Sequence, residues 1–155
     1  MVAGSRANVE ALTERFERAR EWNARARPRR ARREFRALLR DLGWYKETDI
    51  VGADRVAWVW LLARSWMGLA QADLACSGDL PAALKLLDRA LDAAQMLDGI
   101  ERRRVEAVAA GQRGSFLLSA GEPAEAVRLF DQGRIVEATI CEPTFYDPIG
   151  ARKNA

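Results

Sequence analysis

The tetrapeptide Gly78-Asp79-Leu80-Pro81 decides how this chain folds, because it pairs a helix-ending glycine with a helix-starting proline. Glycine is favoured just past the end of a helix, and proline is favoured at the first helical position. Two similar segments, Ala26-Arg27-Pro28 and Gly121-Glu122-Pro123, occur elsewhere in the chain. Each segment is followed by an alanine and, four residues later, a large apolar residue: Ala31 and Phe35, Ala83 and Leu87, Ala126 and Phe130. The pattern predicts three tight turns between antiparallel helices.

Apolar residues recur at helical spacing on both sides of each turn. We expect helices over about residues 6–25, 28–42, 54–77, 81–97 and 101–120, and a sixth from residue 123. Asp54 is the expected N-cap of the third helix, which is apolar on most sides and therefore predicted to be central. The predicted fold class is all-α, with about six helices in three antiparallel hairpins. We expect one domain over residues 1–138 and an irregular tail over 139–155.

Composition and charge are those of a helical domain with a basic first part. The chain has 155 residues, of which 49% are hydrophobic and 30% charged. Residues 1–46 contain 13 of the 25 Lys and Arg but 6 of the 22 Asp and Glu. We find neither a membrane-spanning apolar run nor the apolar core of a signal peptide, so a cytoplasmic location is expected. The preference for arginine over lysine indicates a bacterial source.

The sequence offers little material for catalysis. It contains no histidine, the commonest general base and metal ligand. Cys76 and Cys141 are far apart and form no metal or redox motif. The glycines at 111 and 114 lie within an expected helix, so they do not form a phosphate-binding loop. We therefore expect no enzymatic activity, no metal and no cofactor.

The three hairpins resemble tetratricopeptide repeats over about residues 7–138. In that family, small residues on the two helices of a hairpin face each other, and large residues follow. The third hairpin matches best, through Gly114, Leu117, Gly121, Ala126 and Phe130; the first matches through Ala19, Trp22, Ala31 and Phe35; and the second matches through Leu74, Gly78, Ala83, Leu87 and Ala90.

Two departures from the family pattern are clear. Gln71 occupies a small-residue position of the second hairpin. The family period is about 34 residues, whereas the turns here lie 52 and 43 residues apart. The Ala- and Arg-rich composition also resembles helical repeat regions associated with actinobacterial caspase-like proteins of the CHAT type.

The resemblance implies a non-catalytic adaptor or regulatory module that binds a protein or peptide in a concave groove. The first helix of each hairpin lines that groove in the family. The groove positions implied here are Phe16, Arg20, Asn23, Ser65, Gly68, Ala72, Cys76, Gly111, Ser115 and Leu118. Most are small and would let a helix or an extended peptide approach closely. An alternative is that the chain's own tail, residues 139–155, fills the groove.

A second candidate site is a cluster of arginines around the first turn. Its members are Arg25, Arg27, Arg29, Arg30, Arg32, Arg33 and Arg36. Clustered cations bind phosphates, and Trp22 or Trp44 would stack on bases, so a nucleic-acid-binding module is one alternative function. A solvated helix face and a docking site for an acidic partner segment are the other interpretations. A further alternative is a scaffold that self-associates through an uncapped terminal hairpin.

Overall fold

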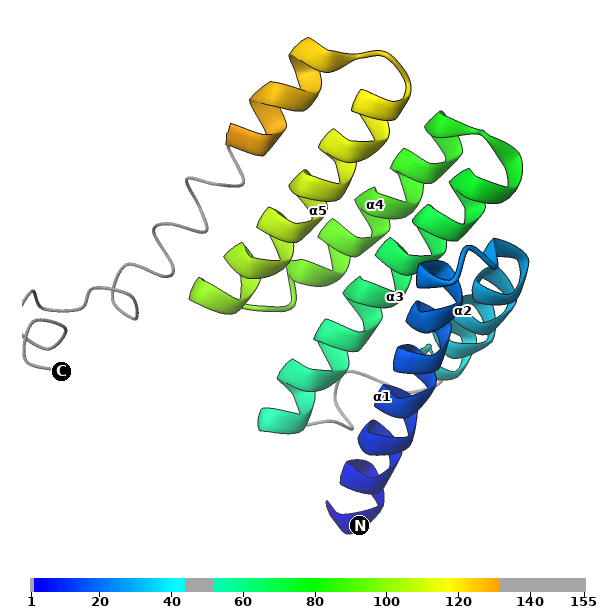
Figure 1. Ribbon diagram of the computed structural model, residues 1–155. Coiled ribbons are helices and arrows are strands. Elements are labelled where there is room, and N and C mark those ends of the chain that lie inside the picture. Colours follow the sequence, from blue (N-terminus) through cyan, green and yellow to red (C-terminus); the bar gives the residue numbers. More distant parts are fainter. Residues whose placement is uncertain (1, 44–51, 132–155) are drawn as a thin grey trace, which may run out of the picture. The chain divides into compact units, whose positions relative to one another are not determined.

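A computed structural model of the chain describes residues 2–43 and 52–131, which form six helices and no strand (Figure 1). The predicted all-α fold is confirmed. The chain divides into two compact units, Met1–Asp98 and Gly99–Ala155. The expected boundary between residues 138 and 139, the tail and Cys141 lie outside the described residues, as does most of the connection around Trp44.

The first unit consists of α1 (Val2–Ala24), α2 (Pro28–Leu42), α3 (Ala53–Ser77) and α4 (Leu80–Ala94). Helix α3 contacts the other three helices, as its apolar composition predicts. Fully buried alanines on α1, α2 and α4 let the helices pack closely: Ala19, Ala31, Ala83 and Ala90. The second unit contains α5 (Gly99–Ser119), and the chain is helical again over residues 123–131.

The three predicted turns are confirmed, and each contains a residue in the left-handed region. Gly78 has φ +69°, and its N–H donates to the Leu74 carbonyl at 2.8 Å. The turn at Gly121 is a Schellman motif, because the Glu122 N–H donates to the carbonyl of Leu117, five residues earlier, at 2.9 Å. Ala26 forms the same motif with φ +53°, although a side chain makes that conformation costly.

The ends of the helices explain why α4 starts where it does and correct one prediction. The Asp79 carboxylate accepts the Ala82 N–H at 3.0 Å and caps α4. The expected N-cap Asp54 was wrong, because α3 already begins at Ala53 and Asp54 lies in its first turn. An acidic residue stabilises a helix at either position, so composition alone does not distinguish them.

One close packing contact fixes α2 against α3. The ring of Phe35 is 1% exposed and lies on the backbone of Gly68. A Cβ at position 68 would lie 2.3 Å from Phe35 Cζ, so only glycine fits there without movement. The ring of Phe16 meets Phe35 edge-on, with 6.0 Å between centroids. In the second unit, Gly114 receives the ring of Phe130 in the same way.

Gly68→Ala is expected to destabilise the protein. Alanine improves helix propensity by about 1 kcal/mol, but overpacking a filled core typically costs about 1–3 kcal/mol. The matched control is Gly111→Ala. A Cβ at position 111 has no neighbour within 4 Å, so this variant gains helix propensity without overpacking the core. Urea unfolding followed by circular dichroism measures both variants. A Gly68→Ala protein as stable as Gly111→Ala would contradict this packing.

Candidate anion-binding surface

Helix α2 carries a stripe of arginines on the side away from its buried residues. Arg29, Arg33, Arg36 and Arg40 are spaced by four, three and four residues, which places them on one face of the helix. All four are exposed. We call these four residues the arginine stripe. Arg40 was missed in the sequence analysis, although the same helical spacing pointed to it.

The arginine stripe borders an open hollow of about 580 Å³. Arg32 also lines the hollow, and the remaining lining residues, Ala37 and Cys76, are small. Ala37 comes from α2 and Cys76 from the last turn of α3. The hollow therefore combines five guanidinium groups with small side chains that allow close approach, a suitable arrangement for an anionic partner.

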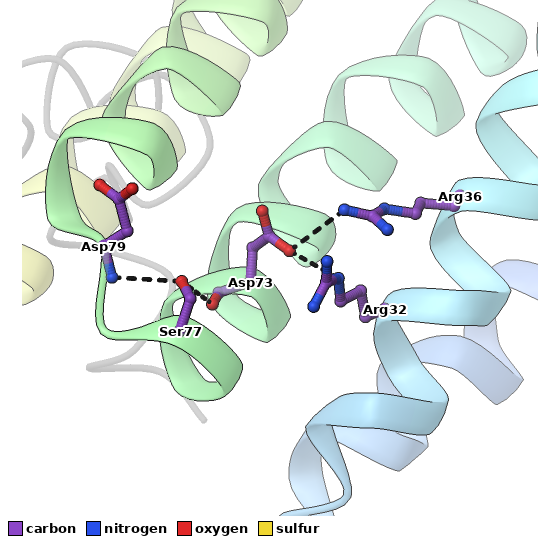
Figure 2. A network of polar contacts seen from close by, with 5 residues as sticks. All are labelled: Arg32, Arg36, Asp73, Ser77 and Asp79. Carbon is purple, nitrogen blue, oxygen red and sulfur yellow. Dashed lines mark hydrogen bonds and ion pairs between the residues drawn. The ribbon is translucent and has the colours of Figure 1, made fainter.

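Asp73 of α3 holds two of these arginines in place (Figure 2). Its Oδ1 lies 2.8 Å from Arg32 Nε and 3.5 Å from Arg36 Nη2. The Nε–H of Arg32 is not aligned for a hydrogen bond, so this contact is an ion pair without hydrogen-bond geometry. Because the carboxylate side chain is only 19% exposed, water screens it less than a surface acid. One negative charge thus balances two positive charges.

The same aspartate is connected to the start of α4. The Ser77 hydroxyl donates to the Asp73 carbonyl at 2.8 Å, and the Asp79 N–H donates to Ser77 Oγ at 3.2 Å (Figure 2). Asp79 in turn caps α4. This chain of contacts ties Arg32 and Arg36 on α2 to the turn between α3 and α4, so the two guanidinium groups rest on a defined support.

The other members of the predicted arginine cluster lie outside the hollow. Arg25 pairs with Glu21 at 2.5 Å, and the Arg30 guanidinium covers the ring of Trp22 at 4.8 Å from its centroid. Arg27 is exposed at the first turn. The predicted cluster is therefore divided by the structure, and one face of Trp22, which was expected to stack on bases, already carries the Arg30 guanidinium.

Three of the seven implied groove residues of the first unit are buried in the core. Phe16, Ser65 and Ala72 are 4%, 0% and 0% exposed, so their expected placement on a binding surface was wrong. Gly68 was expected to admit a partner, but it admits the ring of Phe35. The physical reason is helix packing: at Gly68, α3 lies against Phe35 of α2.

Three further residues of the implied groove have different surroundings. Asn23 Nδ2 donates to the Gly68 carbonyl at 3.0 Å and links α1 to α3. Arg20 is exposed and pairs with Glu17 at 2.7 Å. Cys76 is half-buried and lines the arginine hollow. The structure therefore does not gather the seven implied residues of the first unit on one surface.

In the second unit, the implied residues share one face of α5. Gly111 is half-buried, Ser115 is exposed and its hydroxyl donates to the Gly111 carbonyl at 3.1 Å. Leu118 is 53% exposed, and Val108 on the same face is 50% exposed. This face of α5 therefore carries two exposed apolar side chains, Val108 and Leu118.

Within residues 2–43 and 52–131, no group of three or more Cys, Asp or Glu side chains is placed to hold a metal ion. None of the helices in this part of the chain has the length and apolarity needed to cross a membrane. The arrangement concentrates positive charge around the hollow.

Comparisons with known proteins returned no match: no family model, no curated protein and no solved structure resembles this chain significantly.

Asp73→Asn is expected to lower the free energy of unfolding by about 1 kcal/mol, because two partly exposed arginines lose their shared carboxylate. The matched control is Asp92→Asn on α4, an exposed residue whose substitution is expected to change stability by less than about 0.5 kcal/mol. Urea unfolding at low salt measures both variants. Equal stability of the two variants would contradict the anchoring role of Asp73.

Proposed function

We propose that the chain is a non-catalytic binding module that takes an acidic protein or peptide segment in the arginine hollow. The observation that carries this proposal is the concentration of five guanidinium groups around small residues on one side of α2. An adaptor role agrees with the resemblance to tetratricopeptide repeats, whose stacked helices present binding surfaces. The related resemblance to repeat regions of caspase-like proteins makes such a protein one place to look for the segment.

The charges around the arginine hollow favour an anionic partner. Among residues 2–43 and 52–131, the carboxylates in contact with the five arginines are those of Asp73, Glu34 and Asp41. Asp41 lies 3.9 Å from Arg40 but only 2.6 Å from Arg15, which takes most of its interaction. The Glu34 contact with Arg33 is 3.6 Å long and Arg33 is 77% exposed, so this pair is weak. A positive excess is left facing the hollow.

The magnitude of the expected interaction is modest. An exposed ion pair contributes about 0.2–1 kcal/mol, so four such pairs supply at most about 4 kcal/mol. On that scale, electrostatic contacts alone correspond to a dissociation constant of about 1 mM, and tighter binding requires apolar contacts or several linked sites. Ion pairs between these arginines and an acidic segment also speed the association of the two molecules and make it sensitive to salt. We therefore expect binding to be transient and sensitive to salt.

A nucleic acid is the second candidate partner, because phosphates would use the same arginines. Single-stranded nucleic acids are bound by basic grooves combined with free aromatic faces. Here Arg30 covers Trp22, and Trp44 lies outside the described residues. This contact favours an acidic protein segment over a single strand. Self-association through the exposed apolar side chains of α5, Val108 and Leu118, is a separate alternative.

Arg29→Glu with Arg33→Glu is expected to weaken binding of a labelled Glu-rich peptide by at least about tenfold. Neither arginine contacts Asp73, so the support of the hollow is kept. The control double variant, Arg18→Glu with Arg103→Glu, makes the same charge change at exposed positions elsewhere. Fluorescence anisotropy at low and physiological salt measures the affinities.

Single-stranded and duplex DNA of similar length are titrated in the same assay. Tighter binding of either DNA than of the peptide, lost in the Arg29/Arg33 variant, would replace the acidic segment by a nucleic acid. Equal loss in both double variants would show that net charge, and not the arginine hollow, governs binding.

A further inference from the structure

The arginine stripe has a spacing that an extended chain does not match. Its four residues lie on one helix, so the rises between neighbours are about 6.0, 4.5 and 6.0 Å, and the whole stripe spans about 16.5 Å. Successive side chains on one face of an extended chain are about 6.6 Å apart, so four of them span about 20 Å. An extended acidic peptide therefore falls out of register by about 3.5 Å across the stripe.

A second α-helix can present charges at the same spacing as the arginine stripe, because the rise per residue is the same in both helices. Carboxylates spaced by four, three and four residues on one face have the same rises of about 6.0, 4.5 and 6.0 Å. Two helices that pack side by side have axes about 8–10 Å apart, and small residues at the contact allow the closer distances. Ala37 and Cys76, the small residues of the hollow, lie beside the stripe where such a contact would form.

The support under the stripe favours a rigid partner. Asp73 fixes Arg36 on the stripe and Arg32 beside it, so part of the cost of ordering long side chains is met before a ligand arrives. Arg29, Arg33 and Arg40 are exposed beside this anchored pair. A ligand whose carboxylates are already fixed at the matching spacing gains more from this arrangement than a flexible polyanion does.

We propose that the segment bound in the arginine hollow is an α-helix whose carboxylates lie on one face with a spacing of four, three and four residues. This inference rests on the proposed function and specifies the partner of the same site. Aspartate or glutamate supplies the charge, and Ala37 and Cys76 face the helix between its carboxylates.

Three Ala-rich peptides of about 20 residues with the same four glutamates test the proposal; at this length helix formation is measurable. The first carries the four-three-four spacing. The second places the glutamates at alternate positions, which match one face of an extended chain. The third keeps the spacing of the first but has a central proline, which breaks the helix. Circular dichroism records peptide helicity, and anisotropy against the full chain records affinity.

The first peptide is expected to bind at least about fivefold more tightly than the other two, the equivalent of one to two exposed ion pairs. Arg33→Gln should reduce that preference, whereas Arg30→Gln should leave it unchanged, because Arg30 lies over Trp22 outside the stripe. Equal affinities for all three peptides, lost together in the Arg29/Arg33 variant, would overturn the helical partner and keep the acidic one. Absence of binding by every peptide would overturn the proposed function itself.

Discussion

The contact between the Phe35 ring and the backbone of Gly68 is the constraint on which the first unit depends. It sets how closely α2 approaches α3 and how α2 is rotated about its axis. Because a helix turns by about 100° per residue, burying Phe35 determines which residues of α2 face outward. The arginine stripe lies on the outward side for this reason. A packing contact in the core thus determines where a charged surface is displayed.

Local signals predicted most of the fold. The glycines at 78 and 121 and the prolines at 28, 81 and 123 predicted the turns, and the apolar composition of α3 indicated its central place. Local signals did not determine the faces of α3. Gly68 is small, and small residues serve equally at a close helix contact and on a binding surface. Only the size of the neighbouring Phe35 ring decides between the two, and that neighbour is a tertiary fact.

The candidate site shows the same limit. The arginines were visible in the sequence, including Arg40 through its spacing, but Asp73 was not connected to them. It lies on α3, far along the chain from Arg32 and Arg36, and no local pattern reports that pairing. The division of the arginine cluster had a similar cause, since the cation–π contact of Arg30 with Trp22 depends on how the first turn closes. The tertiary structure therefore decides which arginines make contacts within the chain and which are left to contact a partner.

The arginine stripe also restricts how copies of this chain meet one another. Closed dimers are usually built on a two-fold axis, which places the same patch of both subunits face to face. Across such an axis, the exposed guanidinium groups of α2 would oppose those of the second copy, and like charges at short range repel. The surface for which we propose an acidic helix is thereby disfavoured as a two-fold contact between copies of this chain.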